Sequence, residues 1–355
     1  MDVILYRRDV TLAAPVRASR QLHRRRSRLY LRMEAGGVAG FGEVAPQPEA
    51  LHGDPGVAEV VAALDRVLAV VRAVGQREGG LPSWNRVGRL VAGRPAMRTA
   101  AALVEMALLD RELRLRSALV EDIWPPRFHT PELATVSLLD DGDPWDIAAS
   151  AQRVRVKTRP GPVGAVALER LATVTVPVLV DFNCSARCDD DVLSQLRVIS
   201  RVVDVAAVEQ PFGVGNVADH AHLAARTGVP VSLDEGVRTV SDLTQIARYG
   251  AATVVCVKPA RVGGVAHAHA MVHRANELGL RVYVGGFFES PFARAVHRSL
   301  ARHCVSEPSD LAVVDIEGQM GRDEVVTSAT GFALSPSPAM LRDAATLLEG
   351  HEAAF

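Results

Sequence analysis

Two short stretches of the chain, VRVKTRPG (154–161) and VVCVKPAR (254–261), share one form: a β-branched run, a lysine, then a loop that contains a proline. The chain has 40 lysines and arginines, yet Lys157 and Lys258 are its only lysines. A high-GC genome would favour arginine over lysine at every position. The two retained lysines are therefore expected to mark positions where arginine cannot replace lysine. Both stand at the end of a predicted strand, and the pattern of such strands decides the fold.

The composition is that of a soluble globular protein. The chain has 355 residues, a net charge of −1 and 48% hydrophobic residues, which is enough for a large core and two domains. No apolar run reaches the roughly 18–20 residues that span a bilayer, and MDVILYRRDV lacks the order of a signal peptide. The four cysteines form no CxxC pair or zinc-ligand set. We therefore expect a cytoplasmic protein with reduced thiols and with neither nucleic acid nor a membrane as partner.

Residues 1–130 are predicted to form an α+β domain. RLYLRMEA (28–35) alternates like a strand, Gly36 and Gly37 mark a tight turn, and VAGFGEVAP (38–46) returns as a second strand. Helical patterns follow near 55–74 and 96–116. We expect the C-terminal segment, 326–355, to join this domain.

Residues 131–325 show a different pattern, in which short apolar runs alternate with amphipathic stretches. This β/α alternation predicts parallel strands with right-handed crossovers, and eight units predict a (β/α)₈ TIM barrel. The fold class is therefore α/β, a barrel with an N-terminal α+β domain, which the family resemblance described below implies is a capping domain. The eight predicted strands are LATVSLL (133–139), VRVKT (154–158), PVLVDFN (177–183), VAAVEQP (205–211), VPVSLDEG (229–236), TVVCVKPA (253–260), RVYVGGFF (281–288) and LAVVDIEG (311–318).

Five consecutive predicted strands end in an ionisable residue. In chain order these are Lys157, Asp181, Glu209, Asp234 and Lys258, separated by 24, 28, 25 and 24 residues, about one βα unit each. The C-terminal ends of barrel strands meet at one mouth, where TIM-barrel chemistry takes place. The pattern therefore predicts that all five side chains face one site.

The order of these residues predicts their chemistry. Three carboxylates from consecutive strands cannot all stay ionised without a cation, and a hard divalent ion fits; Mg²⁺ is the default, with Mn²⁺ as the substitute. The lysines then lie on opposite sides of the metal, and we expect their pKa to fall toward ~7–8, the range of a working base. Arginine keeps its proton and cannot do this. A small carboxylate substrate on the metal would lose its α-proton to form a stabilised enediolate.

Three other interpretations stay open on the residues alone. Any one acid at a strand end is more often a helix cap or a salt-bridge partner. The barrel can be catalytically silent and act as a binding module, although a decayed site should lose its ligands first. A metal-dependent aldolase or hydrolase would use histidine ligands, but none of the eleven histidines falls on a predicted strand end. The closely spaced His267, His269 and His273 lie on one predicted helix.

At these residues the chain resembles the enolase superfamily, in particular its muconate-lactonizing subgroup. The matching motifs are K-x-K at 155–157, D-x-N at 181–183, E-Q-P at 209–211, D-E at 234–235, the second lysine at 258, GGFFES at 285–290 and GFGEVAPQPE at 40–49. The resemblance implies that Asp181, Glu209 and Asp234 bind Mg²⁺ and that Lys157 and Lys258 flank the substrate. It also implies a substrate-selecting cap, and members often form homo-oligomers. The chain departs from the family at Arg155, which replaces the first lysine of K-x-K.

The resemblance also implies a set of substrate-binding residues: Arg155, Asn183, Glu235, Glu289, Arg24 and Asp315. Arg24 is expected on a mobile capping loop around 17–28. The eighth strand can be aligned with the family in two competing ways. In one, Asp315 falls on the D-x-D motif of dipeptide epimerases. In the other, SEPSDLA (306–312) aligns with synthases and acylamino acid racemases, and no insertion is needed. The expected reaction is therefore that of an o-succinylbenzoate synthase-like dehydratase or an N-acylamino acid racemase, with a dipeptide epimerase or a muconate-type cycloisomerase as alternatives.

Overall fold

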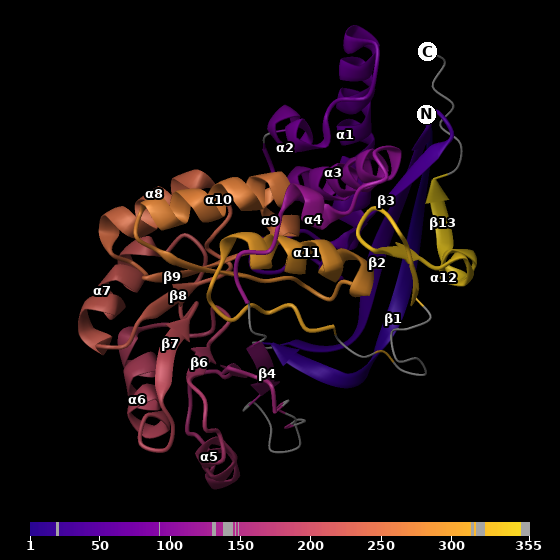
Figure 1. Ribbon diagram of the computed structural model, residues 1–355. Coiled ribbons are helices and arrows are strands. Elements are labelled where there is room, and N and C mark those ends of the chain that lie inside the picture. The colour runs from indigo at the N-terminus through magenta and orange to yellow at the C-terminus, as the bar shows by residue number, and fades with distance from the viewer. Residues whose placement is uncertain are drawn as a thin grey trace.

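The computed structural model describes residues 1–18, 21–91, 93–129, 133–137, 145, 147, 149–313, 316 and 324–348. Their strands form a four-stranded antiparallel sheet, a seven-stranded parallel sheet and a two-stranded sheet of β11 (Val325–Thr327) and β12 (Leu334–Pro336). Figure 1 shows the antiparallel sheet standing beside the curled parallel sheet. No described helix is long and apolar enough to cross a membrane.

The antiparallel sheet has the order β13-β1-β2-β3, with β1 at Asp2–Ala18, β2 at Gln21–Ala35, β3 at Val38–Val44 and β13 at Ala345–Leu348. The hairpin between β2 and β3 is as predicted, with Gly36 and Gly37 both at positive φ in its turn. The sequence pattern did not reveal β1. The loop predicted around 17–28 is wrong from Gln21 onward, because β2 continues there as a ladder with β1.

Two long helices cover this sheet, as their apolar periodicity predicts: α1 (Val57–Glu78) and α3 (Pro95–Leu115). The backbones of β3 and α3 approach closely, and a Cβ at Gly42 would lie 2.1 Å from the carbonyl oxygen of Leu103. Only glycine permits that approach. The shorter elements η1 (Trp84–Arg86), α2 (Val87–Leu90) and α4 (Val120–Ile123) lie on either side of α3 in the chain.

The parallel sheet confirms the predicted barrel architecture. Its order is β10-β9-β8-β7-β6-β5-β4, so sequential strands are neighbours throughout. The strands are β4 (Leu133–Ser137), β5 (Arg153–Lys157), β6 (Val178–Asp181), β7 (Val205–Glu209), β8 (Val231–Leu233), β9 (Val254–Val257) and β10 (Arg281–Val284). The helices after them are α5 (Ala165–Ala172), α6 (Asp189–Ile199), α7 (Val217–Thr227), α8 (Val240–Tyr249), α9 (Pro259–Val262), α10 (Val265–Glu277), α11 (Pro291–Cys304) and, later, α12 (Pro338–Asp343).

The eighth strand position lies earlier in the chain than predicted. The amide of Asp310 donates to the carbonyl of Val284 on β10, and the amide of Leu133 on β4 donates to the carbonyl of Ser309. The segment 309–310 therefore joins both edge strands. The strand predicted at 311–318 is not found over 311–313, and residues 314, 315, 317 and 318 lie outside the described residues. The apolar residues that suggested that strand are used differently: Leu311 is buried, and Ile316 bridges to Leu12 of β1.

The two sheets are joined through a buried carboxylate. Glu105 of α3 accepts a hydrogen bond from the amide of Ala266 at the start of α10, at 2.9 Å. Gly264 leaves the space for it, because a Cβ there would lie 2.4 Å from the carboxylate. Burial raises the pKa of Glu105 to about 8, although the backbone donors Ala266 and Val265 oppose that rise. The folded protein therefore binds this proton more tightly than the unfolded chain does.

We expect Glu105→Gln to flatten the dependence of stability on pH. Because the pKa is raised on folding, this group's favourable contribution is complete below pH 4.5 and is lost as pH rises through about 8. Relative to the wild type, the variant should gain roughly 1–4 kcal/mol in unfolding free energy between pH 5 and pH 8. Urea unfolding at several pH values measures this. Glu169→Gln, at an exposed position of α5, is the control, and parallel curves for wild type and Glu105→Gln would contradict the assignment.

Candidate active site

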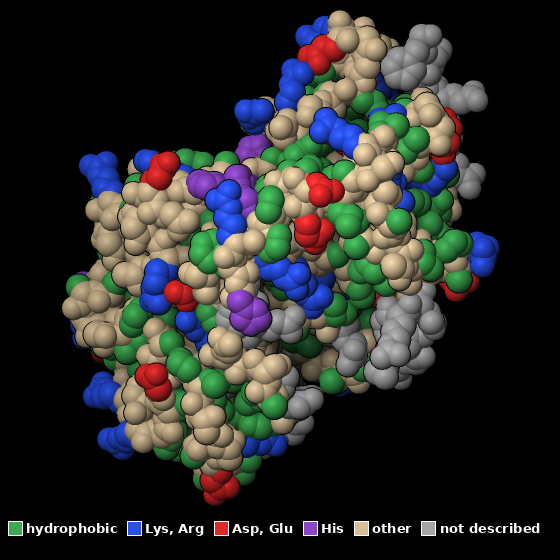
Figure 2. Space-filling view, in the orientation of Figure 1, with side chains coloured by type: hydrophobic (Ala, Val, Ile, Leu, Met, Phe, Trp, Pro, Cys, Tyr) green, Lys and Arg blue, Asp and Glu red, His purple; other side chains and the backbone are tan. Residues whose placement is uncertain are grey.

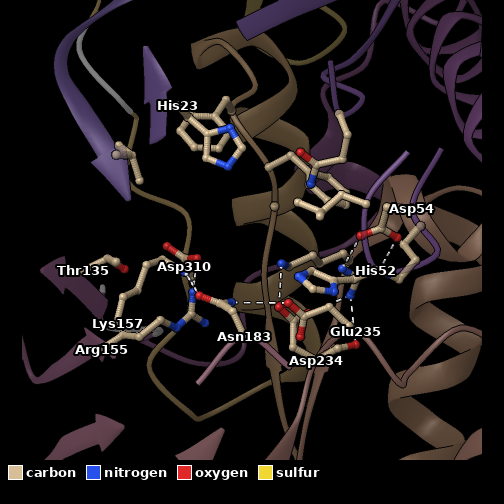
Figure 3. Close-up of a pocket in the computed structure, with 18 of the residues that line it drawn as sticks. His23, His52, Asp54, Thr135, Arg155, Lys157, Asn183, Asp234, Glu235 and Asp310 are labelled. Atoms are coloured by element: carbon tan, nitrogen blue, oxygen red, sulfur yellow. Dashed lines mark hydrogen bonds and ion pairs between the residues drawn. The ribbon is translucent and has the colours of Figure 1, made fainter. Parts of the chain in front are cut away.

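The strand register brings the predicted residues to one mouth. Lys157 is the cross-strand partner of Asp181, and Asp181 is the partner of Glu209. Asp234 directly follows β8, and Lys258 directly follows β9 and caps α9. Below the antiparallel sheet this mouth encloses a cavity of about 300 Å³, and Figure 3 shows its lining. The five strand ends are therefore neighbours, as their spacing predicts. Lys157, Asp234 and Lys258 line the cavity, whereas Asp181 and Glu209 are not among its lining residues.

Each lysine is hydrogen-bonded to a carboxylate on a neighbouring strand end. Lys157 Nζ lies 3.1 Å from Asp181 Oδ2 and 3.1 Å from Asn183 Oδ1, while Lys258 Nζ lies 2.7 Å from Asp234 Oδ2. The lysine side chains are only 12% and 10% exposed. Both ammonium groups are thus held in fixed positions at the cavity wall.

The pKa of Lys258 is raised by its neighbours. Burial disfavours the ammonium form, but the attraction of Asp234 outweighs burial and the repulsion of Arg261. The predicted fall in pKa concerns a lysine beside a bound metal ion, and it stays a prediction. The pKa of Asp234, the partner of Lys258, is lowered. Burial alone would raise it, but the attraction of Lys258 and Arg261 outweighs burial.

Glu209 is the most deeply enclosed of the three acids, at 0% exposure. Burial raises its pKa to about 7; Arg155 opposes this, and Asp181 and Asp234 add to it. The hydroxyl of Tyr283 donates to Oε2, and Ser232 Oγ lies 3.2 Å from the same oxygen. Its other oxygen, Oε1, has no hydrogen bond, although Arg155 Nε lies 3.2 Å away.

The donor set of Asp181, Glu209 and Asp234 fits a hard divalent ion. All three are buried oxygen donors on consecutive strand ends, and Glu209 keeps a buried oxygen without a hydrogen bond. Among the described residues, no three His, Cys, Asp or Glu side chains are gathered into a ready coordination shell. Each carboxylate instead contacts a lysine or an arginine. A bound cation would therefore have to draw these oxygens away from those partners.

Arg155, predicted to bind the substrate, lines the cavity and is engaged by neighbouring side chains. Its guanidinium donates to Asp310 Oδ2 at 2.6 Å and to the Tyr283 hydroxyl at 2.7 Å, beside Glu209. It is 3% exposed, and its charge is matched by these acids, which raise its pKa against burial. Arg155 thus organises the carboxylates around it. Tyr283 was missed, because nothing in RVYV distinguishes it from a core aromatic.

Asn183 and Glu235 both line the cavity. Asn183 Nδ2 donates to Glu235 Oε1 at 3.3 Å, and Glu235 Oε2 is buried without a partner. Burial, with added repulsion from Asp234 and Asp181, raises the pKa of Glu235 to about 8. These two side chains therefore stand where a substrate would meet them.

The other three predicted substrate-binding residues are placed differently. Glu289 is buried, but it pairs with Arg294 at 3.2 Å and does not line the cavity. Arg24 is exposed on β2 and is also absent from the lining. Asp315 lies outside the described residues. The structure therefore does not bring Glu289 or Arg24 to the mouth.

A turn of the capping domain reaches the cavity, and sequence reasoning did not find it. Asp54 forms a two-pronged ion pair with Arg261, whose Nε and second terminal nitrogen each lie 2.8 Å from a carboxylate oxygen. The remaining nitrogen of Arg261 donates to Asp234 Oδ1 at 2.6 Å. His52, in the same turn, lines the cavity together with His23 of β2.

The histidines of α10 lie away from this cavity. His269 Nε2 is 3.2 Å from His273 Nε2, and the ring of His269 stacks on Trp124. Figure 2 shows histidine side chains gathered on the surface over α10. They do not take part in the strand-end cluster.

The comparisons with known proteins agree with this geometry. The family "Enolase C-terminal domain-like" matches residues 146–330. The chain belongs to this family. It is 26% identical over 307 residues to the o-succinylbenzoate synthase of Bacillus subtilis, covering 84% of this chain and 81% of that one. It is 28% identical to an aromatic dipeptide epimerase of Herpetosiphon aurantiacus, covering 75% and 76%.

A solved structure shares the fold of this chain. The crystal structure of an N-succinyl Arg/Lys racemase from Bacillus cereus aligns with a TM-score of 0.80 at 16% identity, covering 99% of this chain and 98% of that one. The chain is therefore an enolase-superfamily enzyme, and the silent-barrel interpretation gives way to an enzymatic one.

Proposed function

We propose that this enolase-superfamily protein removes the α-proton of a small carboxylate substrate in a Mg²⁺-dependent reaction. The observation that carries the proposal is the placement of Lys157 and Lys258 at one enclosed cavity, on strands β5 and β9 that stand four positions apart. Asp181, Glu209 and Asp234 would hold the Mg²⁺, with Mn²⁺ as the substitute ion. Bound there, the ion would supply electrostatic stabilisation of the enediolate.

The protein's own residues divide the remaining work. One lysine, in its neutral amine form, takes the proton from the α-carbon. The other stands at the opposite face as an ammonium group, where it returns a proton or stabilises charge. Before an ion binds, hydrogen bonds to Asp181 and Asp234 hold each Nζ at the cavity wall. The ring of Phe287, which also lines the cavity, has its centre 5.0 Å from Lys258 Nζ and packs beside the lysine.

The eighth strand position favours the synthase or acylamino acid racemase reaction over dipeptide epimerisation. Ser309 and Asp310 occupy that position, as the alignment through SEPSDLA requires. Asp310 is the acid that lines the cavity there, and Arg155 holds its carboxylate at 2.6 Å. At the eighth strand position, the described residues thus offer no unpaired carboxylate for a substrate ammonium. A substrate with an acyl group, such as a succinyl group, suits the cavity better.

Further features of the protein follow as part of this proposal. We assign residues 1–130 and 326–355 to the capping domain, supported by the pairing of β13 with β1, and residues 131–325 to the barrel. The described cysteines are all free thiols, which supports a cytoplasmic location. A homo-oligomer remains a prediction of the family resemblance.

Proton exchange in D₂O tests the proposal. The protein is incubated with Mg²⁺ and, in turn, N-succinyl amino acids, dipeptides and the o-succinylbenzoate precursor, and the α-proton signal is followed by NMR. We expect Mg²⁺-dependent loss of that signal, or dehydration, with an acyl substrate, and none after chelation with EDTA. Exchange with dipeptides alone would overturn the preference for acyl substrates. Absence of both Mg²⁺ binding and exchange would overturn the proposed function.

A further inference from the structure

The capping turn at 51–54 has a backbone that suits glycine at both central positions. Leu51 and Asp54 exchange backbone hydrogen bonds of 3.0 and 2.8 Å, and φ is positive at both intervening residues, 49° at His52 and 80° at Gly53. The second position is glycine, but the first is histidine, which adopts the left-handed region at a cost. A residue retained against that cost calls for a reason in its side chain.

The barrel clamps this turn from two sides. Arg238 donates to the carbonyl oxygens of His52 and Gly53, both at 2.6 Å. Arg261 grips Asp54 through two bonds of 2.8 Å. The turn is therefore held rigidly against strand ends β8 and β9, and the direction of the His52 ring is fixed with it.

The imidazole of His52 lines the cavity, and one of its two ring nitrogens is buried without a hydrogen-bond partner. Figure 3 shows its ring beside Glu235 and Asp234. Its Nε2 is buried without a partner, and a buried polar nitrogen left in that state costs free energy. Burial also lowers its pKa, against the attraction of Asp54 and Asp181, so the ring is neutral near pH 7.

We propose that His52 is a specificity residue whose Nε2–H donates a hydrogen bond to the acyl carbonyl oxygen of the bound substrate. A neutral imidazole with an unused N–H suits a carbonyl oxygen, and an acyl substrate held between the lysines carries one beyond its carboxylate. The inference rests on the proposed function, since it names a contact with that reaction's substrate. It explains together the strained backbone, the two arginine clamps and the unpartnered nitrogen.

The test separates this role from a structural one by the signs of two effects. His52→Gly relieves the backbone strain, and it should raise the melting temperature by about 1–3 °C. The same substitution removes the contact, and it should lower kcat/KM for an N-succinyl amino acid by about 10–100-fold. His52→Asn, which tolerates the left-handed region, should show the kinetic loss without the gain in stability.

A matched control exists at Ser117, an exposed residue with φ of 50° outside the cavity lining. Ser117→Gly should raise the melting temperature similarly and leave kcat/KM unchanged. If His52→Gly and His52→Asn also leave kcat/KM unchanged, the substrate contact is refuted and the unpartnered nitrogen is satisfied by water. If His52→Gly lowers the melting temperature, the ring serves packing and the inference is equally refuted.

An N-alkyl amino acid that lacks the acyl carbonyl shows which group is recognised. The proposal expects His52→Asn to cost the N-succinyl substrate at least about tenfold more than this analogue, and equal losses would contradict it. Failure of the proposed function itself is visible separately, because wild type and Ser117→Gly would then exchange no α-proton. In that case the ¹⁵N chemical shift of His52 Nε2, assigned by the loss of its signal in His52→Asn, still tests the contact. A change of this shift when an N-succinyl amino acid is added would support the contact, and no change would contradict it.

Discussion

Replacing either lysine with alanine is expected to lower Mg²⁺-dependent turnover of the responsive acyl substrate at least about 1,000-fold. Both lysine side chains line the cavity, and each Nζ lies 2.7–3.1 Å from a carboxylate oxygen. Water cannot replace a base fixed in this way, because the cavity is enclosed. The same loss is expected for Lys157→Arg and Lys258→Arg, since arginine keeps the charge but does not release its proton.

Exchange of the α-proton in D₂O, followed for each enantiomer of an N-succinyl amino acid, measures this effect. A racemase with two bases should lose racemisation in both alanine variants. A dehydratase should lose turnover in both but keep slow exchange in the variant that retains the base. Circular dichroism and thermal unfolding check that the variants are folded. Exchange at wild-type rates in either alanine variant would remove that lysine from the mechanism.

Glu209→Gln is expected to weaken Mg²⁺ binding at least about 100-fold and to abolish turnover with it. Glu209 is the middle member of the three acids, and it is fully buried with one oxygen that accepts no hydrogen bond. The amide keeps the size and can still accept from Tyr283, but it removes the charge. It also leaves Arg155 with Asp310 as its close carboxylate partner, so we expect some loss of stability.

Calorimetric titration with Mg²⁺ measures the binding directly, without reference to activity. Glu43→Gln is the matched control, because Glu43 is equally buried but binds Ser290 at the contact between the capping sheet and α11. It should leave Mg²⁺ affinity within about threefold of the wild type. Unchanged affinity in Glu209→Gln would show that this carboxylate is not a ligand and that Arg155 alone explains its presence.

Much of the barrel and its central residues follows from local sequence patterns. Parallel strands with helical crossovers place successive strand ends on one rim, so the spacing of Lys157, Asp181 and Glu209 in the chain predicts their neighbourhood in space. The hairpin of the capping sheet has equally local signals, a pair of glycines between two alternating runs. Such features need only the periodicity of the backbone.

The remaining features depend on contacts between distant parts of the chain. Arg261 meets Asp54 across 207 residues, and Arg28 meets Glu324 across 296. No local pattern marks these partners, so the capping turn, its histidine and the engagement of Arg155 were not predictable. The position of the eighth strand depends on a similar distant contact. An apolar run predicts burial, but Ile316 is buried beside Leu12 of β1, in the antiparallel sheet.

The guanidinium of Arg261 has a consequence for how this enzyme can change. It holds a carboxylate of the cap and a carboxylate of the barrel mouth at once, and it is 3% exposed. Any coupling between the two contacts is reciprocal: the Asp234 contact changes the free energy of the Asp54 contact by as much as the Asp54 contact changes that of the Asp234 contact. A cap turn taken from another protein without an acid at position 54 would leave this buried cation half neutralised. The cap and the barrel are therefore not interchangeable modules, and a transplanted turn must bring its own carboxylate or meet a changed residue at 261.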